Sequence, residues 1–151
     1  MFKMSPVARV RSPRTTLADD GWGQIESEIV LDEALAAECF DGLEAFSHLE
    51  IIYVFDRVAP DQIVAGAEHP RENPAWPKVG IFAQRKKNRP NRLGLTTVEL
   101  LAREGRSLHV RGLDAIDGTP VLDIKPVMAE FLPRGPLRQP DWSHALMSHY
   151  W

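Results

Sequence analysis

The sequence contains little that would link it to an oxidising compartment or a membrane. Cys39 is its only cysteine, so no disulfide can form within the chain, and we expect a reducing, cytoplasmic environment. The longest apolar run, IIYVF at 51–55, is far shorter than the roughly 20 residues of a membrane-spanning helix. The first ten residues lack the apolar core of a secretory signal. We therefore expect no membrane partner.

Several common site signatures are also missing. His144 and His149 are five residues apart, off a common helix face, and no group of residues has zinc-ligand spacing. We expect no metal site, and only His69, in a long loop, stays a weak site candidate. No G-x-S-x-G nucleophile elbow occurs. The one G-x-G, at 21–23, precedes an expected strand rather than a helix, which excludes the usual Rossmann grip on phosphate.

Strand patterns and turn signals are what the sequence has in quantity. Gly105-Arg106 and Asp117-Gly118 have the chemistry of tight turns. Many short strands joined by turns are typical of an antiparallel β-barrel. We therefore predict a mainly β fold in one domain, 1–151, with the barrel at about 7–127 and a C-terminal tail at 128–151. The expected strands are 7–12, 24–31, 49–55, 78–84, 96–104, 107–115 and 119–127.

Two helices are expected beside the barrel. A short one begins at Asp141 or Ser143 in the tail. A longer one begins at Asp32, which can cap it, and a buried thiol is expected at Cys39 because it lies on the apolar stripe of this helix. Between 56 and 77, prolines and poor periodicity predict a long loop, and such loops are usually functional or mobile. The stripe of the longer helix is formed by Leu35, Cys39, Leu43 and Phe46.

Positive charge is concentrated in QRKKNRPNRLG, residues 84–94, which we call the basic loop. It carries +5 and no acid, whereas the whole chain has 18 basic and 21 acidic residues. Stiffened by Pro90, the loop is suited to bind an anion or a nucleic acid. The alternative is a solvated, cation-rich loop, which is the commoner meaning of a charge run. Arg85 differs from its neighbours because it continues an expected strand, so it can point into a pocket.

A second polar cluster is LDAIDGTPVLDIKP at 113–126. The backbone N–H groups of its Asp117-Gly118 turn are suited to face a ligand, but an Asx turn without chemistry is the alternative. No general base stands out. Asp114 and Asp123 are the weak candidates, although Asp123 can instead pair with Lys125 on the same strand face.

These motifs resemble the TsaA-like (TrmO) family of tRNA methyltransferases. The resemblance is carried by GIFAQRKKNRPNRLGLTTVELL (80–101), LHVRGLDAIDGTPVLDIKP (108–126) and FDGLEAFSHLEIIYVFDR (40–57), and it extends from about Val7 to Pro126. It implies a small barrel that binds S-adenosylmethionine without a Rossmann fold and usually works as a homodimer. It also implies methylation of threonylcarbamoyladenosine beside the anticodon of tRNA, and it predicts that the small C-terminal domain of longer members is lacking.

The resemblance also implies which residues contact S-adenosylmethionine. Arg85, the Arg of the A-x-R motif, is expected to take an anionic part of the cofactor. The early Pro-Arg-Gln segment of relatives is missing, and the stretch 21–24 is its expected replacement. Relatives often have His after the apolar strand, where this chain has Asp56. The implied cofactor contacts are Asp56, Arg57, Arg85, Leu95, Ala115, Ile116, Asp117 and Gly118.

The rest of the basic loop is expected to contact tRNA phosphates, with Pro90 limiting the entropy lost on docking. These residues are Lys86, Lys87, Arg89 and Arg92, while Asn91 can instead hold the loop by side-chain hydrogen bonds. The expected function is S-adenosylmethionine-dependent methylation of a tRNA nucleotide. Two alternatives stay open: a non-catalytic barrel that binds the cofactor or RNA as a sensor or adaptor, and a small-molecule methyltransferase.

Overall fold

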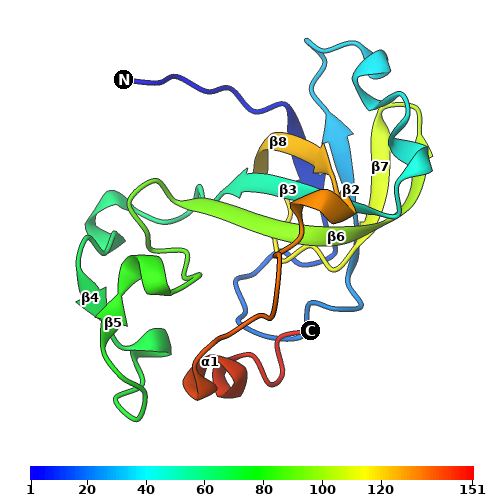
Figure 1. Ribbon diagram of the computed structural model, residues 1–151. Helices are drawn as coiled ribbons and strands as arrows, with labels where there is room; N and C mark the ends of the chain where they lie inside the picture. The colour runs from blue at the N-terminus through cyan, green and yellow to red at the C-terminus, as the bar shows by residue number, and fades with distance from the viewer.

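The alternating segments close into a barrel in the computed structural model, which describes residues 1–151. Every pair of neighbouring strands in the barrel is antiparallel, as predicted (Figure 1). The barrel therefore has no free sheet edge. In their order around it, the six strands are β1 (Ala8–Arg11), β2 (Glu26–Leu31), β7 (Ser107–Arg111), β6 (Leu93–Glu104), β3 (His48–Val54) and β8 (Pro120–Pro126).

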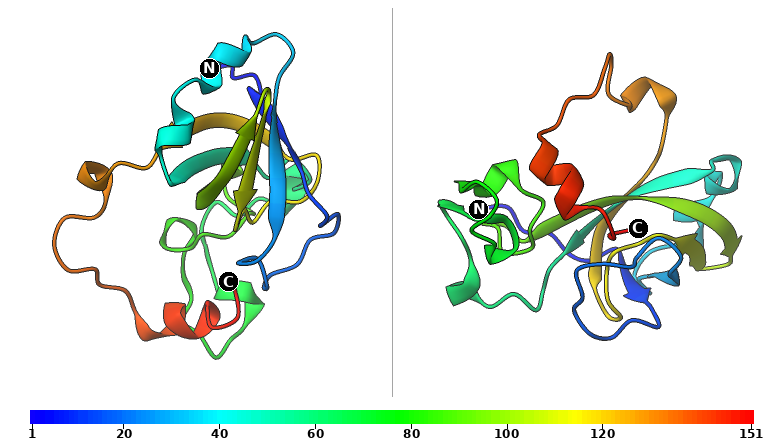
Figure 2. Two further views of the ribbon diagram at one scale, coloured as in Figure 1. Left: turned by 90° about the vertical axis from the view of Figure 1, so that its right-hand side faces the viewer. Right: turned by 90° about the horizontal axis from the view of Figure 1, so that it is seen from below.

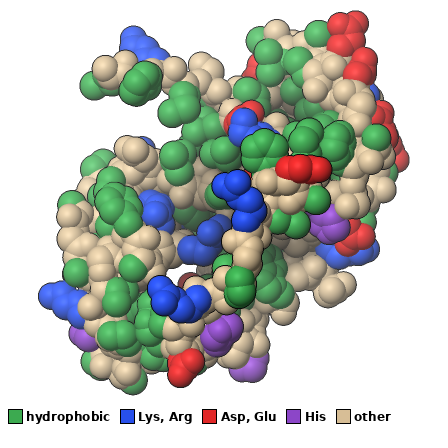
Figure 3. Space-filling view, viewed as in Figure 1, with side chains coloured by type: hydrophobic (Ala, Val, Ile, Leu, Met, Phe, Trp, Pro, Cys, Tyr) green, Lys and Arg blue, Asp and Glu red, His purple; other side chains and the backbone are tan.

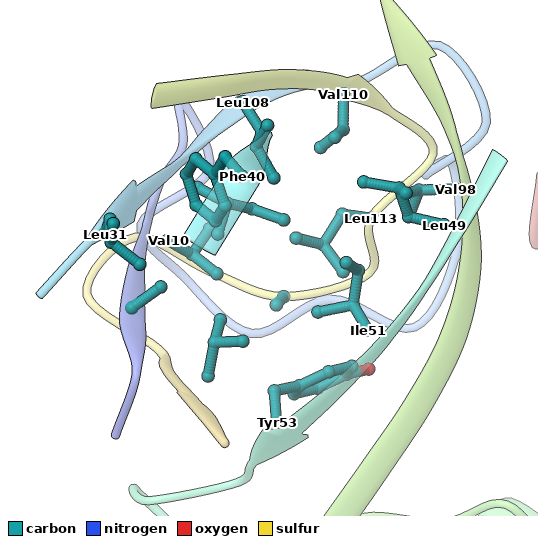
Figure 4. Close-up of a cluster of buried hydrophobic side chains, with 14 residues drawn as sticks. Val10, Leu31, Phe40, Leu49, Ile51, Tyr53, Val98, Leu108, Val110 and Leu113 are labelled. Carbon is teal, nitrogen blue, oxygen red and sulfur yellow. The ribbon is translucent and has the colours of Figure 1, made fainter. Parts of the chain in front are cut away.

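The inside of the barrel is filled by the inward side chains of these strands. In β3, Leu49, Ile51 and Tyr53 are buried while the residues between them are more exposed, because successive side chains in a strand point to opposite faces. They pack with inward residues of the other strands (Figure 4), each fully buried apolar side chain contributing about 1.5–3 kcal/mol. Tyr53 lies at the edge of this cluster. The barrel is thus a core rather than a channel, and any ligand must bind at its ends or outside.

One end of the barrel is closed by the segment between β2 and β3. We predicted a helix here, but the segment forms two short 3₁₀ helices, η1 (Ala37–Phe40) and η2 (Leu43–Ala45). Gly42 separates them with a φ of 91°, a left-handed conformation that interrupts a regular helix. Phe40 is buried in the barrel mouth. The prediction for Cys39 was wrong, because its side chain is exposed.

A side lobe, residues 56–92, is inserted between β3 and β6 and lies beside the barrel (Figure 1). The predicted long loop accounts for its first part, with short 3₁₀ helices η3 (Pro60–Gln62) and η4 (Pro70–Glu72) and the strand β4 (Ala67–Glu68). The strand predicted at 78–84 is wrong for most of its length. Only β5 (Val79–Gly80) is extended, pairing with β4, and Ile81–Ala83 forms the 3₁₀ helix η5.

The tail leaves β8, makes the 3₁₀ helix η6 (Ala129–Phe131) and runs to a short helix, α1 (Asp141–Leu146), as predicted. Residues 128–140 are exposed throughout. The stretch 141–151, which we call the closing segment, then returns towards the barrel (Figure 2). There Gly21 N–H donates to the carbonyl of His149 at 3.0 Å and Trp22 N–H to that of Tyr150 at 2.8 Å. No helix has both the length and the apolar character needed to cross a bilayer.

Candidate ligand pocket at one end of the barrel

A pocket of about 1270 Å³ lies at the barrel end opposite Phe40. Its wall joins four parts of the chain that are distant in sequence: the connection between β1 and β2, the barrel end, the side lobe and the closing segment. In the space-filling view, Lys and Arg side chains gather around a hollow between the lobe and the barrel (Figure 3). No three His, Cys, Asp or Glu side chains come together in a way that could hold a metal ion. The Lys and Arg side chains around the hollow suit the pocket to a ligand with anionic groups.

The polar centre of the pocket is the carboxylate of Asp114. Its Oδ1 accepts a hydrogen bond from the Tyr53 hydroxyl at 2.9 Å and a second from the hydroxyl of Thr96. Its Oδ2 accepts a hydrogen bond from the hydroxyl of Tyr150, in the closing segment. Oδ1 is thus held by two strand residues of the barrel, while Oδ2 interacts only with the segment that closes the pocket.

The two tyrosines at Asp114 stay protonated well beyond neutral pH. Burial raises the pKa of the Tyr53 hydroxyl far above its ordinary value, and the negative charge of Asp114 raises it further. Burial also raises the pKa of Tyr150, with Asp114 again adding to the effect. Both phenols are therefore hydrogen-bond donors, and Asp114 is the acceptor.

The position of Tyr53 depends on Gly94 in the neighbouring strand. Tyr53 and Gly94 are direct partners in the β3–β6 pair. A Cβ atom on Gly94 would overlap the tyrosine ring, so only glycine leaves room for the ring to lie across this strand. The G of the L-G pair in the sequence motif therefore has a packing role: it seats the ring whose hydroxyl fixes Asp114.

The turn at 115–118 has one half in the pocket and one half in the scaffold. Ala115 and Ile116 belong to the pocket wall. Asp117 accepts a hydrogen bond from Ser12 N–H at 3.0 Å, and Gly118, at φ 83°, donates its N–H to the carbonyl of Val10. The predicted tight turn is confirmed, but Asp117 and Gly118 are outside the pocket wall, so the residues of this turn that can contact a ligand are Ala115 and Ile116.

The other residues expected to contact a cofactor also lie in the pocket wall. Arg85 donates from its guanidinium to the carbonyl of Leu95, and both residues line the pocket. Asp56 and Arg57, directly after β3, line it as well. From the stretch 21–24, Trp22 alone reaches the wall. Their role in binding stays a prediction, but the fold brings them to one place.

The cations of the basic loop are not equivalent. Lys86 forms an ion pair with Glu68, Arg89 donates to the carbonyl of Gln84 at 2.8 Å, and Arg92 donates to that of Val58 at 2.9 Å. Lys87 has no such partner and lines the pocket. Three of the four expected RNA contacts therefore also hold the lobe together.

The remaining candidates have structural partners. Asp123 forms an ion pair with Lys125 at 2.8 Å and lies outside the pocket wall. The imidazole Nδ1 of His69 is hydrogen-bonded to the carbonyl of Trp76 at 2.7 Å, within the lobe. Of the two asparagines in the basic loop, Asn88, and not Asn91, makes a side-chain hydrogen bond, to the carbonyl of Gln62.

This protein is a closed, six-stranded antiparallel β-barrel with a charged ligand pocket at one end. The chain belongs to the tRNA-methyltransferase O N-terminal domain family, whose model matches residues 10–131. This confirms the family resemblance that the sequence motifs predicted.

Individual relatives agree with this assignment. A mouse tRNA (adenine(37)-N6)-methyltransferase is 46% identical over 90 residues, which are 60% of this chain and 20% of the mouse protein. A probable S-adenosyl-L-methionine-binding protein of Methanothermobacter thermautotrophicus is 41% identical over 130 residues, 83% of this chain and 89% of that protein. The crystal structure of TrmO from Pseudomonas aeruginosa aligns with a TM-score of 0.73 at 27% identity, over 91% of this chain and 61% of that one. The chain thus spans about a fifth of the mouse relative and less than two thirds of the solved one.

Proposed function

We propose that this protein binds S-adenosylmethionine in the pocket and uses it to methylate N6 of an adenine in tRNA. The observation that carries the proposal is that Arg85, Leu95, Ala115 and Ile116 line one pocket with the Asp114 carboxylate at its centre. The names of the relatives support the same activity, since they include tRNA (adenine(37)-N6)-methyltransferases and S-adenosyl-L-methionine-binding proteins. In its finer form, the proposed acceptor is threonylcarbamoyladenosine beside the anticodon.

The pocket residues fit S-adenosylmethionine chemically. Arg85 supplies a guanidinium for the carboxylate of the cofactor, and Asp56 a carboxylate for its ammonium group or ribose hydroxyls. Phe55, Leu95 and Ile116 supply apolar wall for the adenine ring. The volume of about 1270 Å³ exceeds the roughly 300–1000 Å³ of a typical small-molecule site. The pocket therefore has room for more than the cofactor alone.

The bound cofactor would supply a methyl group on a sulfonium, whose carbon–sulfur bond breaks as the new nitrogen–carbon bond forms, sulfur keeping the electron pair. The work of the protein is to hold both reactants in line. Asp114 Oδ2 is the group that can accept an N–H of the acceptor, which orients the nitrogen and receives its proton. Tyr53 and Thr96 fix this carboxylate through Oδ1. Asp123 lies outside the pocket wall, which leaves Asp114 as the candidate base.

The RNA would approach the pocket from the side of the lobe. Lys87 and Arg57 make no ion pair or side-chain hydrogen bond and line the pocket, so their charges are available for phosphates. Lys86, Arg89 and Arg92 keep the lobe in shape through their contacts with the lobe itself, and a phosphate contact from any of them would come in addition to that role. A homodimer in the cytoplasm stays a prediction from the family resemblance, and light scattering after size exclusion would test the oligomeric state.

Incubation with methyl-labelled S-adenosylmethionine and bulk tRNA tests the proposed activity. We expect label in tRNA at an adenine N6, lost in the Asp114→Asn variant and retained in Asp123→Asn. Saturable cofactor binding without transfer to tRNA would instead support the sensor or adaptor function. One observation favours that second function: the Oδ2 atom proposed to face the acceptor is engaged by Tyr150. Label in small metabolites alone would contradict both.

A further inference from the structure

The closing segment places an aromatic ring and a hydrogen-bond donor at the centre of the pocket. Tyr150 and Trp151 line the pocket together with Leu146 and Met147. The two aromatic rings meet edge to face, with centroids 4.8 Å apart. The Tyr150 hydroxyl donates to Asp114 Oδ2. The segment therefore forms part of the pocket wall and also fills part of the space beside Asp114.

Few polar interactions hold the closing segment against the barrel end, although Trp151 also packs so closely on Gly23 that a Cβ atom there would overlap it. The polar ones are the two backbone hydrogen bonds from Gly21 and Trp22 and the hydrogen bond from Tyr150 to Asp114. The connecting residues 128–140 are all exposed, so no packing fixes the path of the linker. The segment can therefore leave the pocket at the cost of a few contacts while the barrel stays folded.

Tyr150 presents to Asp114 the same chemistry as an adenine. Both have a flat aromatic ring that can fill an apolar slot, and both carry an exocyclic donor at its edge, O–H in tyrosine and N6–H in adenine. Asp114 Oδ2 can accept from only one of them in this position. A ring that lacks the donor and carries a carbonyl there, such as hypoxanthine, would face the carboxylate with a like partial charge and be rejected.

We propose that the seat of the Tyr150 ring beside Asp114 is the acceptor-base subsite, and that Tyr150 occupies it as an internal competitor until an adenine displaces it. This inference rests on the proposed function. Asp114 Oδ2 selects the amino group of adenine over a carbonyl, and the closing segment sets how often the subsite is open. The hydroxyls of Tyr53 and Thr96 keep Oδ2 directed at this seat.

The test measures the binding of adenosine monophosphate and inosine monophosphate by equilibrium dialysis, with S-adenosylhomocysteine at saturation to fill the donor site. In Tyr150→Ala the affinity for adenosine monophosphate should rise about tenfold, as expected when a competitor that fills the seat nine times in ten is removed. Inosine monophosphate should stay weak. The double variant Tyr150→Ala, Asp114→Asn should lose the gain. His144→Ala is the matched control, since this side chain is exposed on α1 and outside the pocket wall.

Tyr150→Phe keeps the ring and removes only the hydroxyl, so it should show a smaller gain even if the alanine variant folds poorly. No gain for adenosine monophosphate in either variant, or an equal gain for inosine monophosphate, would overturn the subsite. Label transfer to tRNA is measured on the same protein preparations, with labelled S-adenosylmethionine in place of S-adenosylhomocysteine. Intact transfer without the affinity gain refutes the subsite alone, whereas the gain without transfer from any variant refutes the proposed function alone.

Discussion

At the barrel end that Phe40 fills, the arginines bind other groups of the chain itself, whereas at the pocket end two cations, Arg57 and Lys87, have no internal partner. Arg103 pairs with Asp41 at 2.8 Å and Glu44 at 3.0 Å, and it also donates to the carbonyl of Ala37. Hydrogen bonding to Asp41 raises the pKa of Arg103. At the other end, Arg57 and Lys87 make no comparable contact, although both lie in the pocket wall.

The difference separates two uses of the same kind of side chain. At the closed end, Arg103 and Arg106 fasten the segment 32–45 to the β6–β7 hairpin through carboxylates and backbone carbonyls. This satisfies polar groups that the strand ends and short 3₁₀ helices would otherwise leave unpaired. At the pocket end, cations without internal partners are what an anionic ligand would use. Four variants, the last with a contrasting partner, test this division, from the largest expected effect to the smallest.

Asp114→Asn should produce the largest change. It keeps the shape of the side chain but removes the negative charge that would take the proton from the methylated nitrogen. Methyl transfer to tRNA should fall at least about 100-fold, the usual contribution of a positioned base. Single-turnover transfer of label measures the rate, and calorimetry should show cofactor affinity within about twofold of the parent protein. A variant that still transfers at near-parental rate would remove Asp114 from the chemistry.

Arg85→Ala should weaken the binding of S-adenosylmethionine about tenfold or more, because a charge-assisted hydrogen bond is worth about 1.5–3 kcal/mol. The fold should persist, since this guanidinium makes one hydrogen bond inside the chain, to the carbonyl of Leu95. Isothermal titration calorimetry measures the affinity and circular dichroism checks folding. An unchanged dissociation constant in a folded variant would contradict the assignment.

Arg103→Ala is the counterpart at the closed end. It should lower the thermal midpoint by several degrees and leave cofactor affinity unchanged, because its partners, Asp41 and Glu44, belong to the segment that closes the barrel. Differential scanning calorimetry gives the midpoint. If this variant lost cofactor affinity while keeping its stability, the two ends would not differ in the way described.

Lys87→Gln should have the smallest effect. It should reduce the slope of log affinity for tRNA against log salt by about one and leave cofactor binding alone. Arg92→Gln is the contrasting variant. Arg92 sits at a φ of 53° and donates to the carbonyl of Val58, so this change should mainly lower stability. Filter binding over a range of salt concentrations measures the slopes, and identical slopes for Lys87→Gln and the parent would exclude a phosphate contact.

The sequence predicted the barrel because its determinants are local. The alternating residues of β2, the short apolar run of β3, the Gly105 turn between β6 and β7 and the Asp117-Gly118 turn before β8 each depend on a few neighbouring residues. Six of the eight cofactor contacts implied by the family motif lie in the pocket wall, and Asp117 and Gly118 do not.

The misplaced elements depended on contacts between distant segments. Apolar spacing over 32–46 was consistent with a helix. In the structure the barrel mouth buries only Phe40 fully, and Gly42 separates two short 3₁₀ helices. The apolar stretch at 78–84 was consistent with a strand, but Gln84 turns inward and donates to the carbonyls of Glu68 and Val79, which favours the lobe over the barrel.

The site feature that sequence analysis missed was the pair of tyrosines at Asp114. The sequence gives a local signal for Tyr53, because it lies two positions after Ile51 and is the last residue on the buried face of β3. Tyr150 has none: 36 residues separate it from Asp114, with an exposed linker between, so only the folded chain places it there.

The most direct test of the account is a crystal structure with S-adenosylmethionine bound. The account predicts the cofactor carboxylate on Arg85, its adenine against Leu95 and Ile116, and its methyl group facing Asp114 Oδ2 in the pocket between barrel and lobe. A cofactor bound at the Phe40 end or on the outer face of the sheet, or one whose methyl group points away from Asp114, would contradict it.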